Sequence, residues 1–164
     1  MLMEAVASLN CKKGGIYLDG TVGGGGHAYE ILNKTGPDGI LVGIDLDEDA
    51  LLASERRLDA FGDRKILVKG NYADIKSILT DFGIERVDGI LLDVGVSSHQ
   101  LESAERGFSF SLDAPLDMRM NRTGNVTAAD VVNGFSGDQL RRIVRDYGEE
   151  MRYAKIVGAI LARR

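Results

Sequence analysis

The chain has 164 residues, of which 44% are hydrophobic and 27% are charged, which is enough to bury the core of a globular domain. No apolar stretch approaches the roughly 20 residues of a membrane-spanning helix, so we expect no membrane partner. The net charge of −5 excludes a protein that is basic throughout. The single cysteine, Cys11, excludes an internal disulfide and favours a cytoplasmic location.

Apolar runs alternate with helix-like segments along the first part of the chain. We expect strands at 16–18, 40–44, 66–68 and 89–92, and helices at 27–33, 48–61 and 73–82. Continuous apolar strands separated by helices are typical of βαβ units, so we predict an α/β fold with a parallel sheet covered on both faces. Right-handed crossovers then place the turn after each strand along one edge of the sheet.

The pattern changes after Asp93. Residues 95–122 contain no convincing strand or helix beyond a short turn near residue 100, and a loop of this length is usually functional. Helices are expected again at 127–133, at 137–147 with Ser136 as the cap, and from 149 to the last residue. We therefore expect a core over residues 1–100, a long functional loop over 101–125, and a helical region over 126–164.

The run from Asp19 to His27 contains four consecutive glycines directly after the first expected strand. Because glycine has no Cβ, such a turn can take positive φ and let a ligand lie against the backbone. The turn also opens an expected helix, whose free N–H groups suit an anionic group. A second carboxylate, Asp45, ends the next apolar run, where it can accept both hydroxyls of a ribose. This arrangement indicates a nucleoside-containing cofactor at the carboxyl ends of parallel strands.

Two cofactor classes fit this pattern. A nicotinamide dinucleotide needs glycines near its pyrophosphate and an acid about 20 residues further on, which Asp45 nearly satisfies. That motif does not require an acid before the glycines. S-adenosylmethionine has no phosphate, but its α-amino group requires a carboxylate close to the first turn, which Asp19 or Asp93 supplies. The spacing from Asp19 to Gly25 matches the common methyltransferase pattern, so methyl transfer is favoured.

Four motifs, which follow one another along the chain, narrow the choice of protein family. They are DGTVGGGGH (19–27), LDVGVSSHQL (92–101), RGFSF (106–110) and DAPLDMRM (113–120). Together they closely resemble the bacterial 16S rRNA (cytosine-N4)-methyltransferase family, type H, over essentially the whole chain. The resemblance implies a Rossmann-like class I methyltransferase fold with an inserted helical domain. It also implies S-adenosylmethionine as the donor and a cytosine in the decoding region of 16S rRNA, in the small ribosomal subunit, as the acceptor.

The resemblance also assigns cofactor contacts by motif. The residues are Gly25, Gly26 and His27 in the first turn, Asp45, Tyr72 and Asp93 after the second, third and fourth strands, and Gln100 in the following loop. The ring of Tyr72 can lie against the adenine. His99 has no partner histidine or cysteine at the spacing of a metal-binding motif, so no metal site is expected.

The exocyclic N4 of cytosine is a poor nucleophile because its lone pair is delocalised into the ring. We expect the enzyme to align this nitrogen with the sulfonium methyl group and to accept a hydrogen bond from it. Asp93, or a backbone carbonyl within residues 94–97, is a candidate for this acceptor, but cofactor binding is the favoured role of Asp93. Arg106 and Arg119 are candidates for RNA phosphate contacts or for salt bridges within the long loop.

Members of this family continue for about as many residues again, so the expected fold is truncated within the helical insertion. We then expect a fourth strand at an open apolar edge, weak cofactor binding and little or no methyltransferase activity of this chain alone. A second copy in a homodimer could cover that edge. The alternatives are a catalytically inactive cofactor-binding or structural member of the family, a small-molecule methyltransferase, or a nicotinamide enzyme.

Overall fold

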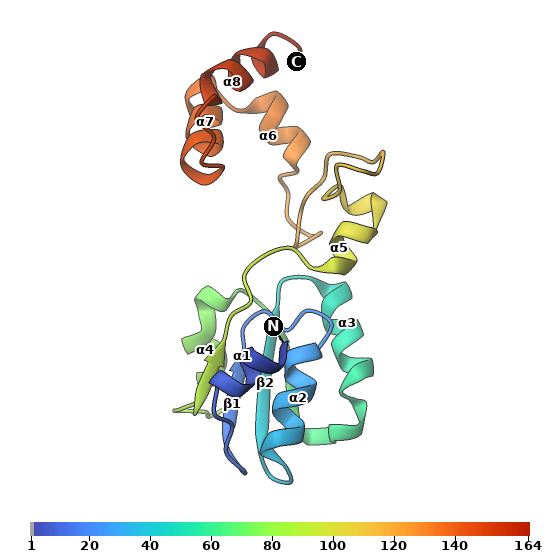
Figure 1. Cartoon of the computed structure of the whole chain (residues 1–164), viewed down its shortest axis with the longest axis vertical. Helices are drawn as coiled ribbons and strands as arrows, with labels where there is room; N and C mark the ends of the chain where they lie inside the picture. Colours follow the sequence, from blue (N-terminus) through green and yellow to red (C-terminus); the bar gives the residue numbers. More distant parts are fainter. Residues whose placement is uncertain (1) are drawn as a thin grey trace. The chain divides into compact units, whose positions relative to one another are not determined.

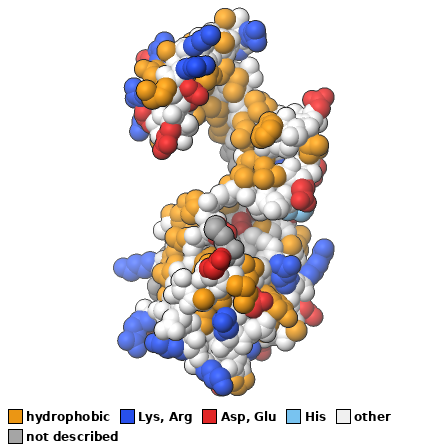
Figure 2. All heavy atoms as spheres, viewed as in Figure 1, with side chains coloured by type: hydrophobic (Ala, Val, Ile, Leu, Met, Phe, Trp, Pro, Cys, Tyr) orange, Lys and Arg blue, Asp and Glu red, His pale blue; other side chains and the backbone are white. Residues whose placement is uncertain are grey.

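The computed structural model of the protein describes residues 2–164, which form two compact units that divide after Gly95 (Figure 1). The sequence-based boundaries placed the end of the core slightly later, at residue 100. Figure 2 shows hydrophobic side chains on the surface of both units. Each unit is described by itself.

The described residues of the first unit build a four-stranded sheet in the order β3-β2-β1-β4. The strands are β1 (Ile16–Asp19), β2 (Ile40–Asp45), β3 (Lys65–Lys69) and β4 (Gly89–Leu91). All neighbours are parallel, and Leu18 of β1 lies opposite Val42 on one side and Ile90 on the other. The α/β fold and the four expected strands are confirmed, each to within one residue at its start.

Helices cover both faces of this sheet, as Figure 1 shows. They are α1 (Leu2–Ser8), α2 (Gly26–Thr35), α3 (Glu48–Arg57) and α4 (Ile75–Asp81), with 3₁₀ turns η1 (Asp59–Arg64) and η2 (Tyr72–Asp74). Tyr17 and Leu41 pack with side chains of α1 and α2 in one buried cluster. Their chain neighbours Leu18 and Val42 pack with side chains of α4 in the other. Because successive strand residues point to opposite faces, the continuous apolar runs supply both clusters.

The helix expected over 48–61 is shorter than predicted. It ends at Arg57 and gives way to η1, within which Gly62 has φ 55° and ψ −129°. That backbone conformation favours glycine and cannot continue a helix. The chain therefore turns here and enters β3.

β4 lies at one end of the strand order. Ile90 is 49% exposed and Leu92 is 47% exposed, so this apolar edge is open, as the sequence predicted. Pairing of the edge with a second copy of the chain stays a prediction.

The second unit is mostly helical. Its elements are α5 (Ser98–Glu102), η3 (Ala104–Arg106), α6 (Ala128–Gly134), α7 (Gly137–Arg142), the π-helical turn η4 (Ile143–Tyr147) and α8 (Tyr153–Leu161). Ser136 caps α7 as predicted, because its side chain accepts a hydrogen bond from Gln139 N. The predicted start of the last helix at residue 149 is wrong, because α8 begins at Tyr153. Glu149 has φ 50°, a left-handed conformation that separates η4 from α8.

Residues 107–127 form a long loop that is fixed by arginine side chains. Arg106 is only 2% exposed, and its Nη2 donates to the carbonyls of Arg119 and Met120 at 3.0 and 3.2 Å. Arg119 forms an ion pair with Asp117 at 2.7 Å, and its hydrogen bonds lower the pKa of that carboxyl to about 2. Of the two alternatives for these arginines, the structural one therefore describes Arg119, and burial makes Arg106 unsuitable for an RNA phosphate.

Replacing Gly107 by alanine is expected to destabilise this loop by about 2–4 kcal/mol. Gly107 has φ +70°, and an added Cβ would overlap the carbonyl oxygen of Pro115. Gly134→Ala is the matched control, because a Cβ at Gly134 meets open space. Thermal unfolding followed by circular dichroism compares the two variants. Equal midpoints would contradict the tight packing of Gly107 against Pro115.

Two further features are absent from residues 2–164. None of the described helices combines the length and apolar character needed to cross a membrane. Within the same residues, no group of three histidine, cysteine or acidic side chains is placed to hold a metal ion.

Candidate functional site

Hydrogen bonds to the turn that follows β1 connect the carboxyl ends of β1, β2 and β4. Asp45, at the end of β2, accepts a hydrogen bond from Gly23 N at 2.9 Å. Asp93, in the segment after β4, donates from its backbone N to Thr21 Oγ1 at 2.7 Å. The expectation that Asp19, Asp45 and Asp93 gather at one edge of the sheet is therefore confirmed.

Asp19 is the most unusual group at this edge. It is fully buried, and Oδ1 accepts from Thr21 N and Thr21 Oγ1. Its Oδ2 has no hydrogen-bond partner among the described residues. Burial is the main cause that raises the pKa of Asp19 to about 6. The charges of Asp45 and Asp93 act in the same direction, and the hydrogen bonds from Thr21 act against it. A buried carboxyl with one open acceptor and two acidic neighbours suits a cationic donor such as an ammonium group.

The glycine turn brings backbone N–H groups to the same edge. Gly23 and Gly25 have φ values of 52° and 75°, which L-residues with a side chain rarely adopt. The first N–H groups of any helix lack intrahelical acceptors, and in α2 they begin with Gly26 and the half-buried His27. The N-cap residue Gly25 has no side chain that could accept from them. This end of the helix is positive and suits an anionic group such as a carboxylate.

Tyr72 also lies at this edge. It follows β3 and is 41% exposed. A Cβ on Gly20 would lie 3.1 Å from Tyr72 Cβ and 2.5 Å from Leu92 Cδ2. Gly20 therefore lets the segments after β3 and β4 approach the end of β1, and Tyr72 Cβ lies next to the residue that follows Asp19.

Gln100 differs from the other predicted cofactor contacts because it belongs to the second unit. It is buried, and its side chain forms a capping box with Ser97 at the start of α5. Ser97 N donates to Gln100 Oε1 at 3.0 Å, and Gln100 N donates to Ser97 Oγ at 3.2 Å. The structure thus shows a helix-capping role, and cofactor contact by Gln100 stays a prediction.

Sequence reasoning missed the importance of Thr21, which joins Asp19 to the segment containing Asp93. A signal was present in the sequence. Thr21 stands two residues after an aspartate at a strand end, a position from which its N–H can bond the aspartate side chain in an Asx turn.

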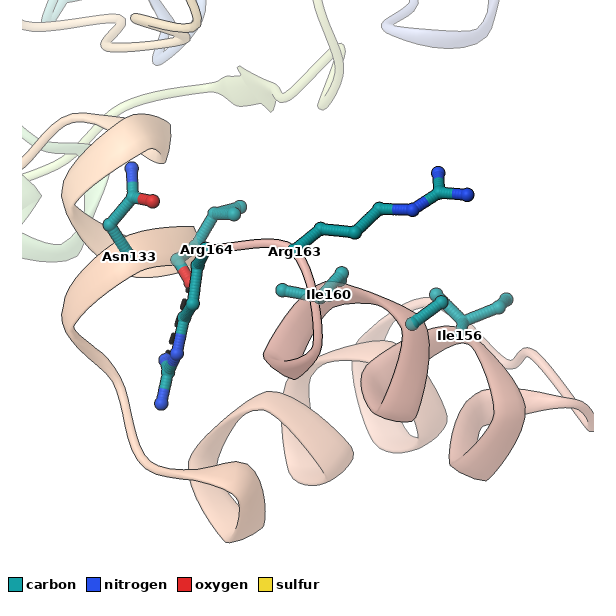
Figure 3. A pocket seen from close by; sticks show the side chains of 7 residues that line it. Asn133, Ile156, Ile160, Arg163 and Arg164 are labelled. Atoms are coloured by element: carbon teal, nitrogen blue, oxygen red, sulfur yellow. Dashed lines mark hydrogen bonds between the residues drawn. The ribbon is translucent and has the colours of Figure 1, made fainter.

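A cavity of about 420 Å³ lies in the second unit, between α6 and α8 (Figure 3). It is lined mainly by apolar side chains such as Val132, Ile156 and Ile160, together with Arg163 and Arg164. Arg164 Nη1 donates to the carbonyl of Phe135 at 2.6 Å. Without a carboxylate in its lining, this cavity does not match the chemistry of the edge described above.

Comparison with other sequences gives close relatives. A protein of Syntrophus aciditrophicus named ribosomal RNA small subunit methyltransferase H is 59% identical over all 164 residues of this chain, which cover 52% of that protein. A protein of the same name from Geotalea daltonii is 53% identical over 161 residues, covering 98% of this chain and 51% of the relative. The chain therefore spans about half the length of the curated relatives it matches.

Solved structures with a similar arrangement include TrmN from Thermus thermophilus. It has a TM-score of 0.49 and 22% identity, covering 60% of this chain and 29% of that protein. An S-adenosylmethionine-dependent O-methyltransferase from Thermotoga maritima has a TM-score of 0.46 and 21% identity, covering 57% and 34%.

The parallel sheet with helices on both faces and a glycine turn after β1 is a Rossmann-like methyltransferase arrangement. A family model matches residues 1–164, which is the whole chain. The chain belongs to the MraW methylase family.

Proposed function

We propose that this chain forms the S-adenosylmethionine-binding part of an enzyme that methylates the N4 amino group of a cytidine in 16S rRNA. Family membership and the names of the close relatives support methylation of small-subunit rRNA. The observation that carries the proposal for this chain is the buried Asp19, whose Oδ2 lacks a hydrogen-bond partner among the described residues and lies near the charges of Asp45 and Asp93.

The residues at the sheet edge fit the parts of this cofactor. The unpartnered acceptor of Asp19 suits the α-ammonium group, and the N–H groups at Gly26 and His27 suit the carboxylate. Asp45 keeps lone pairs for ribose hydroxyls although both its oxygens accept backbone N–H groups, from Gly23 and Asp47. We propose that Asp19 contacts the cofactor together with the residues that the family resemblance assigns, which are Gly25, Gly26, His27, Asp45, Tyr72, Asp93 and Gln100.

A nicotinamide dinucleotide fits the same edge less well. Its pyrophosphate carries negative charge, and the edge places three carboxylates around the glycine turn. The three carboxylates repel a negatively charged pyrophosphate, whereas they attract the ammonium and sulfonium groups of S-adenosylmethionine.

When bound, S-adenosylmethionine supplies an electrophilic methyl group. The chain's contribution is to hold the acceptor amino group in line and to accept one of its N–H hydrogen bonds, since positioning alone can lower the barrier by several kcal/mol. Asp93 is exposed, and its backbone is anchored by Thr21 Oγ1. We propose that its carboxylate accepts this hydrogen bond.

Isothermal titration calorimetry tests the cofactor. We expect the chain to bind S-adenosylmethionine and to bind NAD far more weakly. Preferential binding of NAD would contradict the proposal.

Replacing Asp93 by asparagine separates its two roles. If the carboxylate accepts the hydrogen bond from the cytidine amino group, D93N retains its affinity for S-adenosylmethionine and methylates small ribosomal subunits about 10²–10⁴-fold more slowly, the usual contribution of a positioned acid or base. The assay is made in a full-length relative that carries the matching substitution. Loss of cofactor affinity with the same substitution would instead assign Asp93 to binding.

A second candidate function is cofactor binding without catalysis by this chain alone. The half-exposed Ile90 and Leu92 at the β4 edge favour it, because an unpaired apolar strand leaves the neighbouring segment with Asp93 poorly supported. A methylation assay on small ribosomal subunits distinguishes the two candidates. Turnover comparable with that of a full-length relative would exclude the second.

A further inference from the structure

Two side chains of α3 donate hydrogen bonds to backbone carbonyls of the glycine turn. Ser54 is fully buried, and its Oγ donates to the carbonyl of Gly23 at 2.7 Å. One helical turn later, Arg57 Nη1 donates to the carbonyl of Gly24 at 3.0 Å. Residues three apart lie on the same helix face, so α3 presents both donors to the turn together.

These contacts fix the direction of the peptide groups in the turn. In a trans peptide, the C=O and the following N–H point in opposite directions. Since Ser54 holds the Gly23 carbonyl, the Gly24 N–H points away from α3, toward the open side of the turn. The next peptide is held at both ends, because Arg57 binds the Gly24 carbonyl and Gly25 N donates to Val22 O at 2.8 Å.

The same helix is tied to the carboxylate that faces the cofactor. Asp45 Oδ2 accepts from Gly23 N, and its Oδ1 accepts from Asp47 N at 2.9 Å. Asp47 is the N-cap of α3 and accepts from Asp49 N at 3.1 Å. Asp45, the start of α3 and the glycine turn therefore form one hydrogen-bonded network.

We propose that Ser54 and Arg57 are positioning residues for the cofactor, which hold the glycine turn in its ligand-binding conformation without touching the ligand. The inference rests on the proposed function and extends it to residues outside the motifs of the sequence. The physical reason is that glycine residues have many accessible backbone conformations, including those with positive φ. Hydrogen bonds from Ser54 and Arg57 stabilise one of these conformations of the turn.

Ser54→Ala tests the inference, with Ser77→Ala as the matched control. Ser77 Oγ also donates to a backbone carbonyl, that of Asp74 at 2.9 Å, but it lies on α4. We expect S54A to raise the dissociation constant for S-adenosylmethionine about tenfold, as the loss of one buried hydrogen bond implies, and S77A to leave it unchanged. Calorimetry on the 164-residue chain measures both.

Arg57 has its own control in its chain neighbour Arg56. We expect R57A to weaken binding about two- to fivefold, because its bond to Gly24 is exposed to solvent. R57K keeps a donor and should recover most of the affinity, whereas R56A should bind like the unmodified chain.

A spectroscopic measurement distinguishes positioning from general destabilisation. In S54A the ¹⁵N amide resonance of Gly24 should shift, because its peptide group contains the released Gly23 carbonyl. A lowered unfolding midpoint with an unchanged dissociation constant would assign Ser54 a structural role only and overturn the inference. Failure of the unmodified chain to bind the cofactor would contradict the proposed function itself, and the inference with it.

Discussion

Asp19→Asn is expected to stabilise the ligand-free chain by up to about 3 kcal/mol at pH 8, since the pKa of this buried carboxyl lies near 6 instead of 3.8. At pH 8 the folded chain must hold a buried charge whose Oδ2 lacks a partner among the described residues. Asparagine removes the charge and keeps an oxygen that can accept from Thr21 N. Urea unfolding of both proteins measures the difference in the free energy of unfolding.

The sign of the pH dependence follows from the direction of the shift. The folded state binds the Asp19 proton more tightly than the unfolded state does, so the stability that this group contributes is lost as pH rises through about 6. The advantage of D19N is therefore greatest above pH 7 and disappears toward pH 4. Asp117→Asn is the control of opposite sign, because the pKa of Asp117 is lowered by Arg119 and its loss should destabilise the chain at pH 8. A D19N advantage that does not change between pH 5 and pH 8 would contradict this explanation.

The same substitution should weaken cofactor binding at least about tenfold, because a hydrogen bond between charged groups is lost. Asp19 would then reduce the stability of the free protein while contributing to binding. Such a trade-off is common for groups in binding sites. It also explains why an unfavourable buried charge is compatible with a well-packed sheet.

The sheet and its functional edge could be predicted from the sequence because they depend on short-range patterns. Continuous apolar runs specify buried parallel strands, and the fixed handedness of the crossovers brings the strand ends to one edge. The carboxylates at Asp19, Asp45 and Asp93 therefore could be placed together without coordinates.

The remaining features depend on backbone conformations that hydrophobic periodicity does not encode. Gly62 takes positive φ just after the predicted end of the helix at residue 61, and Glu149 takes positive φ at the predicted start of the last helix. The short helix α5 was predicted only as a turn near residue 100, because its signal is a capping box between Ser97 and Gln100 instead of an apolar face. The buried position of Ser54 under the glycine turn is a tertiary contact over 31 residues of sequence, which no local pattern specifies.

Gly25→Ala is expected to destabilise the chain by about 2–3 kcal/mol, the sum of a left-handed alanine and a tight contact. Gly25 has φ +75°, and an added Cβ would lie 3.1 Å from Ser54 Oγ and 3.3 Å from Ser54 Cα. Relief of this strain requires a shift of the turn, so the dissociation constant for S-adenosylmethionine should also rise about 5- to 30-fold, which corresponds to 1–2 kcal/mol.

Gly24→Ala is the stability control for Gly25→Ala within the same turn, because a Cβ at Gly24 would have no heavy atom within 4 Å. The free energy of unfolding of G24A should therefore stay near that of the unmodified chain. In the double variant G25A/S54A the Oγ contact is absent, so its destabilisation should be less than the sum of the two single variants. Urea unfolding of the four variants measures this coupling. Full additivity, or equal stability of G24A and G25A, would show that α3 does not constrain the turn at Gly25.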